Sequence, residues 1–212
     1  MKIYHFKKVS STNDVAKEIA MKGERNFVVV ADEQTKGKGR MGREWLSPLG
    51  GLYFSIVTKI NPMLPLISGV SVAYSLKKFG LFPRIKWPND VMIKNKKISG
   101  ILIECFDDFA VVGAGVNINS TPLETATSRK DEIRKNVSKD AVLISILKNF
   151  EEFSEKNVLD EYKKLCFTIG RRVKIKTVKG DTEGKAVDVD EHGYLILENG
   201  ERIVSGDIIH LR

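Results

Sequence analysis

The sequence predicts an α+β protein, with a mixed, largely antiparallel sheet packed against helices and a small second β unit near the C-terminus. Short apolar strands separated by Asn-Asp, Asn-Lys and Asp-Asp turns occupy residues 84–119, which is typical of an antiparallel meander. Segments 62–79 and 141–167 have helical length and apolar content, and short alternating strands follow Gly170. With 212 residues, of which 42% are hydrophobic, the chain can bury one good core and a small second one.

The first quarter of the chain predicts strands around one helix. Ser11 and Thr12 offer N-cap hydroxyls to a helix that ends at Gly23. The apolar run FVVVA predicts a buried strand, whereas LYFSIV has alternating faces. The expected elements are strands at 3–6, 27–31 and 52–57, a helix at 12–23, and a long polar loop at 32–51.

The rest of the chain predicts helices and two groups of strands. Pro65 and Gly69 weaken the first half of the helix expected at 62–79. The segment from 120 to 140 is polar, and we interpret its charged stretch as a solvated face. Amphipathic helices are expected at 141–150 and 158–167, and a five-stranded barrel after Gly170. We therefore expect one domain at residues 1–168 and a second at 169–212.

The formal net charge of +8 favours an anionic partner such as a nucleotide, a nucleic acid or an acidic protein surface. Residues 170–212 contain eight Lys or Arg and eight Asp or Glu, so the excess lies in the larger domain. An RNA-binding module is one hypothesis, although the neutral β unit and the lack of an aromatic stacking stripe argue against it. No apolar run approaches the ~20 residues of a membrane span, so we expect a cytoplasmic protein without membrane contact.

Cysteine and histidine offer no metal or redox pattern. Cys105 and Cys166 are far apart and form no CxxC, so both are interpreted as packing residues. His5, His192 and His210 are isolated in the sequence and are assigned surface or packing roles.

A glycine-rich loop contains Gly37, Gly39 and Gly42 in a GxGxxG pattern. A dinucleotide-binding turn would pass directly from strand to helix, but five residues separate FVVVA from Gly37, and REWLSPLGG cannot begin an ordinary helix. Two interpretations remain: an anion cradle in which Lys38, Arg40 and Arg43 add charge beside the backbone N–H groups, or a flexible basic surface loop.

A second motif, KWPNDV at residues 86–91, lies between two strands, and Lys97 begins the next strand. The segments STN, ADEQTKGKGRMGREWLSP, GLYFS, KWPNDV, KKISGILIE and GAGVNIN follow one another along the chain. This order of motifs resembles the biotin protein ligases, and the resemblance covers essentially the whole chain. It implies a class II synthetase-like catalytic domain and an SH3-like C-terminal barrel.

The resemblance also implies a reaction, in which ATP activates biotin to biotinyl-5′-AMP and the biotinyl group passes to a lysine of a biotin carboxyl carrier protein. The implied catalytic residues are Lys97 and Arg40. The implied biotin-binding residues are Ser11, Thr12, Asn13, Gln34, Gly37, Lys38, Gly39, Arg40 and Lys97. The implied ATP-binding residues are Arg40, Arg43, Trp45, Asn89, Asp90, Lys97 and Asn117. Asp90 is assigned either to Mg²⁺ or to deprotonation of the incoming amine.

The resemblance leaves several points open. The loop departs from the common GRGRRG form at Lys38 and Met41, so the resemblance carries over no side-chain role at those two positions, whereas Arg40 is retained. A lipoate ligase, with a related fold and the same adenylate chemistry, is the nearest rival. No segment of winged-helix size precedes the motifs, so DNA binding is not expected, and a homodimer through the central sheet stays open. The glycines predict that residues 36–43 become ordered only with ligand.

Overall fold

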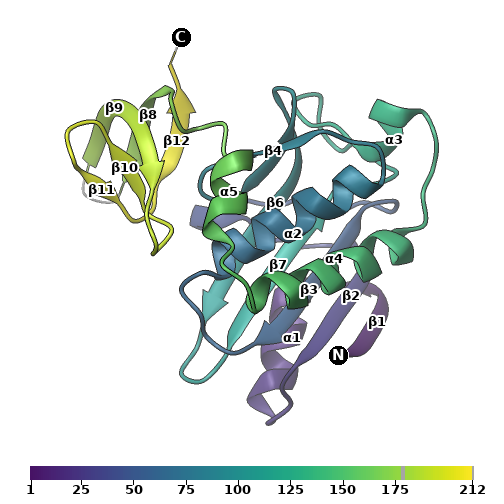
Figure 1. The fold of residues 1–212 in the computed structure, drawn as a ribbon. Coiled ribbons are helices and arrows are strands. Elements are labelled where there is room, and N and C mark those ends of the chain that lie inside the picture. The colour runs from purple at the N-terminus through teal and green to yellow at the C-terminus, as the bar shows by residue number, and fades with distance from the viewer. Residues whose placement is uncertain (178–179, 212) are drawn as a thin grey trace.

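In the computed structural model, which describes residues 1–177 and 180–211, the chain forms a seven-stranded sheet and a separate five-stranded sheet (Figure 1). The strands of the larger sheet are β1 (Lys2–Val9), β2 (Phe27–Gln34), β3 (Leu52–Thr58), β4 (Pro83–Lys86), β5 (Asp90–Ile93), β6 (Lys96–Cys105) and β7 (Ala110–Val116). Their order is β1-β2-β3-β7-β6-β5-β4, with β1 parallel to β2 and every other pair antiparallel. The predicted α+β fold with a mixed, largely antiparallel sheet is confirmed.

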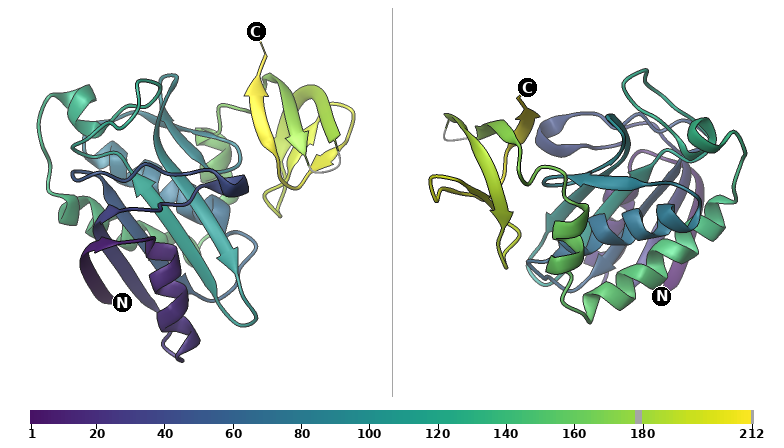
Figure 2. Two further views of the ribbon diagram at one scale, coloured as in Figure 1. Left: turned by 180° about the vertical axis from the view of Figure 1, so that it is seen from behind. Right: turned by 45° about the horizontal axis from the view of Figure 1, so that its top comes forward.

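Helices cover both faces of this sheet. They are α1 (Thr12–Met21), α2 (Leu64–Lys78), α3 (Arg129–Ile133), α4 (Lys139–Ser154) and α5 (Leu159–Leu165), with one 3₁₀ turn, η1 (Arg40–Gly42). Helices α2, α4 and α5 lie on one face in Figure 1, and α1 lies on the other, which Figure 2 shows from behind. The first part of β2, residues 27–31, is apolar on both faces because Val28 packs into the core with α2 and α4, while Val29 packs against α1.

The smaller sheet follows the larger one in the chain. Its strands are β8 (Arg172–Thr177), β9 (Gly180–Val189), β10 (Leu195–Leu197), β11 (Arg202–Ile203) and β12 (Asp207–His210), in the order β11-β10-β9-β8-β12. The expected small five-stranded β unit is therefore present. The division at residues 168 and 169 stays a prediction.

Several polar contacts hold the smaller sheet beside the rest of the protein. The Trp87 indole N–H donates to the Gly193 carbonyl at 2.9 Å, and Lys163 pairs with Asp188 at 2.8 Å. Thr168 Oγ1 lies 3.1 Å from His210 Nε2. The small sheet is thus fixed beside β4 and α5, which places its β11–β12 turn near the glycine-rich loop (Figure 2).

Some local expectations were wrong or incomplete. Cys166 is buried as expected, but Cys105 is exposed because it ends β6 at the surface. The polar segment 120–140 contains the short helix α3, which the sequence reading missed. No helix in the described part of the chain has the length and apolar character needed to cross a membrane.

Candidate active site

A cleft lies on the α1 face of the larger sheet, between the start of α1, the loop that joins β2 to β3, and strands β5–β7. It contains about 760 Å³ of empty space, part of it open to solvent. The glycine-rich loop crosses above these strands (Figure 2), so loop and sheet form opposite walls of one cavity.

The floor of the cleft is formed by glycines, so it consists of backbone without side chains. A Cβ atom added to Gly113 would lie 2.0 Å from Asn13 Oδ1, and one added to Gly115 would lie 2.1 Å from Trp45 Nε1. Gly100 on β6, the register partner of Gly115, is nearly as crowded, with Trp45 and Lys97 atoms at 3.0 and 3.1 Å from its added Cβ. Glycine at these positions lets side chains from α1 and the loop reach the sheet.

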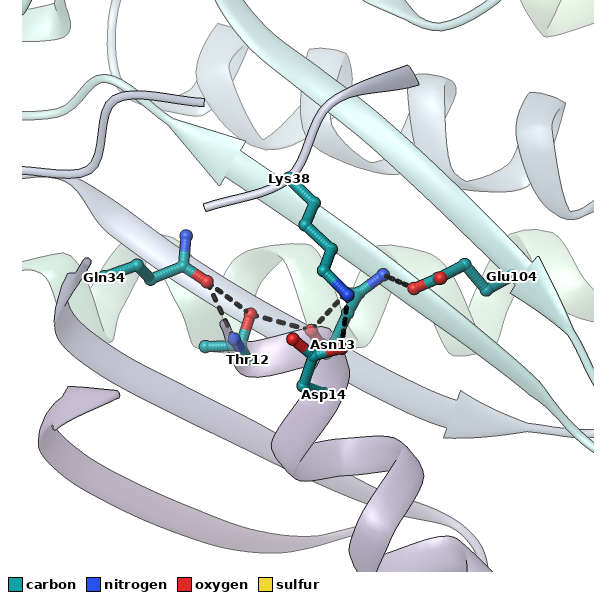
Figure 3. Close-up of polar contacts among 7 residues, drawn as sticks. Thr12, Asn13, Asp14, Gln34, Lys38 and Glu104 are labelled. Carbon is teal, nitrogen blue, oxygen red and sulfur yellow. Dashed lines mark hydrogen bonds and ion pairs between the residues drawn. The ribbon is translucent and has the colours of Figure 1, made fainter. Parts of the chain in front are cut away.

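The start of α1 carries a buried polar network. The Thr12 backbone N–H donates to Gln34 Oε1 at 2.8 Å, and Asn13 Nδ2 donates to Glu104 Oε2 at 2.7 Å (Figure 3). The Ser55 hydroxyl lies 2.6 Å from Asn13 Oδ1, so both ends of the Asn13 amide are held. The network thus fixes the side chains of Thr12, Asn13 and Gln34 where they line the cleft.

Lys38 ties the loop to α1. Its ammonium reaches from the loop to the Asp14 carboxylate, as Figure 3 shows. The hydrogen bond with Asp14 raises the pKa of Lys38 above its ordinary value. Lys38 therefore stays charged and holds the loop across the end of the cleft where the polar network lies.

Within the loop, backbone hydrogen bonds form a narrow hairpin. The Trp45 N–H donates to the Gly37 carbonyl at 2.8 Å, and the Gly39 N–H donates to the Arg43 carbonyl at 2.7 Å. A Cβ atom at Gly37 would lie 2.3 Å from the Trp45 carbonyl oxygen, so a side chain there would open the hairpin. The hairpin presses the Trp45 indole onto the glycine floor, where its N–H is buried without a hydrogen-bond partner among the described residues.

Three cationic side chains, those of Arg40, Arg43 and Lys97, line the other end of the cleft. Arg40 donates to Asn89 Oδ1 at 3.2 Å and to the Gly206 carbonyl at 3.4 Å, and burial lowers its pKa. Arg43 pairs with Asp207 on β12. Lys97 Nζ lies 2.7 Å from Asp90 Oδ1 and 5.1 Å from the centre of the Trp45 ring. Lys86 on β4 does not line the cleft, but it is near these groups: burial lowers its pKa, the charge of Asp90 raises it, and the charges of Lys97 and Arg43 lower it.

The structure brings most of the predicted site residues together. Those that line the cleft are Ser11, Thr12, Asn13, Gln34, Lys38, Gly39, Arg40, Arg43, Trp45, Asn89, Asp90 and Lys97. Gly37 and Asn117 do not line it. Gly37 shapes the loop, and Asn117 is buried behind the sheet end, where its Nδ2 donates to the Thr127 carbonyl at 3.1 Å.

Sequence reasoning missed part of the lining. The missed residues are Glu44, Gly100, Ile101, Leu102, Gly113, Ala114, Gly115 and Asp207, together with Glu104, which holds Asn13. The alternating glycines of GAGV were a usable signal, because glycine inside a strand often marks close approach by another group. Asp207 gave no signal, because it is 164 positions from its partner Arg43.

Two family descriptions match this chain. Residues 5–117 match the Biotin/lipoate A/B protein ligase family, and residues 168–211 match the Biotin protein ligase C terminal domain. The first match includes α1, the glycine-rich loop and strands β5–β7, so it spans nearly the whole cleft.

Individual proteins agree with these matches. The Bifunctional ligase/repressor BirA of Bacillus subtilis (strain 168) is 32% identical, over 97% of this chain and 73% of its own length. The biotin–acetyl-CoA-carboxylase ligase of Mycobacterium tuberculosis (strain ATCC 25618 / H37Rv) is 30% identical, over 87% of this chain and 79% of its own. The solved structure of a biotin protein ligase from Aquifex aeolicus in complex with biotin and ATP is 35% identical, with a TM-score of 0.85, and covers 100% of this chain and 99% of that one.

Proposed function

We propose the reaction from one premise: the chain belongs to the biotin/lipoate A/B protein ligase family and, within it, to the biotin protein ligases. It activates biotin with ATP to biotinyl-5′-AMP and transfers the biotinyl group to a lysine of an acceptor protein. Because the M. tuberculosis relative is named for acetyl-CoA carboxylase, we propose the biotin carboxyl carrier protein of such an enzyme as the acceptor.

One observation carries the proposal: Arg40 and Lys97, which are distant in sequence, line the same cleft. In the first step, a biotin carboxylate oxygen attacks the α-phosphorus of ATP and pyrophosphate leaves. Two anions about 4 Å apart repel by ~4 kcal/mol at an effective dielectric constant of about 20. Two fixed cations in one cleft offset that repulsion and stabilise the charge that develops in the transition state.

Lys97 acts in this step as a charged donor and forms no covalent intermediate. Its ion pair with Asp90 and its place over the Trp45 ring fix the ammonium at the edge of the glycine floor. Positioning and electrostatics of this kind account for most of the catalysis of phosphoryl and nucleotidyl transfer.

The polar network at the start of α1 is proposed to hold the head group of biotin. Thr12, Asn13 and Gln34 present hydroxyl and amide groups of fixed orientation, which suit the N–H and C=O groups of a ureido ring. Gly113 below them leaves room for a ring to approach the backbone. The acid end of biotin then extends toward Lys97 and Arg40.

Mg²⁺ is proposed to accompany ATP. Mg²⁺ is commonly bound by one or two carboxylates together with substrate phosphates, and Asp90 supplies one carboxylate beside the cluster of cations. No group of three or more His, Cys, Asp or Glu able to hold a metal occurs within residues 1–177 and 180–211, which fits an ion held mainly by the nucleotide. The ion would neutralise phosphate charge as the α-phosphorus is attacked.

In the second step, the amine of the acceptor lysine attacks the carbonyl carbon of the mixed anhydride, and AMP leaves. Water must be kept away because the anhydride hydrolyses readily. The loop residues that line the cleft, between Lys38 and Trp45, are proposed to cover the anhydride and to supply this protection.

The decisive experiment is to incubate the pure protein with biotin, ATP and Mg²⁺ and to measure biotinyl-AMP and pyrophosphate. We expect adenylate formation by the wild type and a loss of about 10²–10³-fold in Lys97→Ala and in Arg40→Ala, a typical cost of removing a group that stabilises transition-state charge. Lys96→Ala is the matched control, because Lys96 is the exposed neighbour of Lys97 on the same strand.

The same assay separates biotin from lipoate. Each acid is offered with ATP and a carrier domain, and transfer is followed by mass spectrometry of the carrier. Lipoyl transfer without biotinyl transfer would overturn the proposed substrate, and full activity of Lys97→Ala would overturn the proposed mechanism.

A further inference from the structure

The segment that leads from α5 to the small sheet runs beside the edge strand β4 (Figure 1). The Phe167 N–H donates to the Ile85 carbonyl at 3.0 Å. Next along both segments, the Trp87 N–H donates to the Thr168 hydroxyl oxygen at 3.1 Å. Trp87 and Thr168 are both buried, so the hydroxyl supplies the partner that a buried backbone N–H requires. Thr168 therefore holds the beginning of the turn that joins β4 to β5.

Thr168 also contacts the small sheet. Its Oγ1 lies 3.1 Å from Nε2 of His210, the last residue of β12. Burial and the positive charges of nearby side chains lower the pKa of His210 to about 4, so its ring is neutral at pH 7 and has one accepting nitrogen. The Thr168 oxygen accepts from Trp87, so its hydrogen remains to be donated, and the buried Cys166 thiol beside it is only a weak acceptor. The Thr168 O–H therefore donates to His210 Nε2.

Both partners of Thr168 lead to Arg40. The turn that begins at the first of them carries Asn89, whose Oδ1 accepts from Arg40 Nη1 at 3.2 Å. Strand β12, which ends at His210, is preceded by Gly206, whose carbonyl accepts from the same Nη1 at 3.4 Å. Arg40 Nη1 is thus held between the β4–β5 turn and the small sheet, and Thr168 fixes these two parts of the protein relative to each other.

Packing alone does not explain a threonine at this position. Valine has nearly the same shape, and it would leave no polar atom to be desolvated in a fully buried site. A buried hydroxyl is favourable only where its oxygen and its hydrogen both find partners. Thr168 meets that condition because the residue after β4 and the last residue of β12 each supply one. The hydroxyl therefore serves to join the two strands.

We propose that Thr168 is a positioning residue for Arg40, because it fixes the turn and the strand whose Asn89 and Gly206 orient the guanidinium for the first half-reaction. This inference rests on the proposed function. Thr168 does not line the cleft, so it acts only through its neighbours. Without the hydroxyl, the turn and β12 can move apart, and the guanidinium loses its fixed place beside the reacting groups. A displacement of ~1 Å can cost a catalytic group about 10²-fold in rate.

The test measures biotinyl-AMP formation by Thr168→Val, which removes the hydroxyl and keeps the shape of the side chain. We expect kcat to fall about tenfold, a fraction of the cost of a ~1 Å displacement. The KM values for biotin and ATP should change less than about twofold. Thr168→Ser keeps the hydroxyl and should restore most of the rate. His210→Leu removes only one of the two partners and should lower kcat less than Thr168→Val does.

A double-mutant cycle with Arg40 separates positioning from a general loss of structure. If Thr168 acts through Arg40, Thr168→Val should change the residual rate of Arg40→Ala less than about twofold. Ser75→Ala is the matched control, because Ser75 on α2 is a buried hydroxyl that accepts from Asn149 Nδ2 at 2.8 Å, on the face of the sheet opposite the cleft. It should lower the urea concentration at the midpoint of unfolding, as Thr168→Val does, without changing kcat.

Nitrogen-15 NMR tests the hydrogen bonds of Thr168 without an assay of activity. In the wild type at pH 7, the ring nitrogens of His210 should show a proton on Nδ1 and an accepting Nε2. In Thr168→Val the amide hydrogen of Trp87 should exchange with solvent faster than in the wild type, because it has lost its partner.

The proposal would be overturned by wild-type kcat in Thr168→Val, by an equal loss of rate with and without Arg40, or by a proton on His210 Nε2. A loss of kcat in Ser75→Ala as large as in Thr168→Val would overturn it as well. If circular dichroism shows that Thr168→Val is unfolded, His210→Leu takes its place in the cycle. A wild type that forms no biotinyl-AMP would refute the proposed function, and the NMR measurement would still decide whether Thr168 links the β4–β5 turn to β12.

Discussion

Gly113 and Gly115 determine how closely other groups approach β7. A strand normally loses stability from glycine, which has no side chain to pack and more conformational entropy to lose. Here each glycine makes room for a specific neighbour, Asn13 above Gly113 and Trp45 above Gly115. The two glycines therefore lower the stability of the strand but let other side chains reach the floor of the cleft.

Alanine at these two positions should affect the KM for biotin and the KM for ATP differently. Gly113→Ala places a methyl group against Asn13, so we expect the KM for biotin to rise more than the KM for ATP. Gly115→Ala displaces Trp45, so we expect the KM for ATP to rise more. Steady-state kinetics with each substrate varied in turn would measure both constants.

Gly69→Ala is the control for these variants. Its added Cβ would lie 3.4 Å from Ile85 Cδ1, an ordinary contact, in the middle of α2. The free energy of unfolding should rise by about 0.5–1 kcal/mol, the usual gain for alanine over glycine inside a helix, without a change in either KM. If all three variants showed equal changes in KM, Gly113 and Gly115 would have no specific role in binding either substrate.

Among the structural elements, the glycine-rich loop is the one that we expect to respond most to ligand. It lies over the cleft, its tip is η1, and Met41 within that turn has a φ of 55°. The expectation that residues 36–43 become ordered only with ligand stays a prediction. Loops that close over substrates are drawn from the less stable parts of a fold.

Limited proteolysis would test this closure. Trypsin cleaves after Lys or Arg, and the loop offers Lys36, Lys38, Arg40 and Arg43. With biotin and ATP each at about ten times its dissociation constant, we expect cleavage in the loop to slow about tenfold, because ligand binding reduces the open fraction. Cleavage after Arg134, which is outside the cleft, serves as the internal control. Loop cleavage at the same rate with and without ligands would exclude closure.

The elements themselves were predictable where hydrophobic period and turn chemistry agreed. FVVVA, LYFSIV and the strands after Pro83 all form where their apolar pattern placed them. Helix α3 was missed because its five residues are too few to show a period, and it depends on the Ser128 hydroxyl, which accepts from the Asp131 N–H at 3.1 Å. Strand β1 is longer than predicted because it pairs with β2 in parallel, a partner that its polar outer residues do not reveal.

At the scale of the whole molecule, the position of the small sheet beside the large one determines which groups contact the loop that covers the cleft. Asp207 and Gly206 of the small sheet contact Arg43 and Arg40 of the loop. The motifs pointed to the loop arginine of each pair, but a contact between sheets cannot be read from local sequence pattern. The larger domain and its motifs were therefore predictable, whereas the contribution of the smaller one was not.

The junction between the sheets should respond to acid through His210. Burial, together with the charges of Lys86 and Arg171, lowers the pKa of His210 from its ordinary 6.5 to about 4. Between these pH values the unfolded chain binds a proton that the folded protein does not, so stability decreases as pH falls from 6.5 toward 4. In the folded protein His210 gains its proton only near pH 4, so its contact with Thr168 should persist down to about that pH.

Urea unfolding at pH 7 and pH 4.5 would measure this effect. We expect His210→Gln, which stays neutral, to lose less stability between the two pH values than the wild type. His192→Gln changes an exposed histidine of the same sheet and controls for the titration of other groups. If the stability of the wild type and of His210→Gln depended on pH in the same way, His210 would not be the cause of the acid-dependent loss of stability.

A cleft floored by bare backbone can be changed by substitution in one direction only. Every replacement of Gly100, Gly113 or Gly115 adds atoms, so the space above these strands can be narrowed but not deepened. An engineer who wants the enzyme to accept a bulkier acid must therefore alter the walls, at Thr12, Leu102 or the loop. For the same reason, related proteins that differ in substrate choice should differ mainly at residues of those walls.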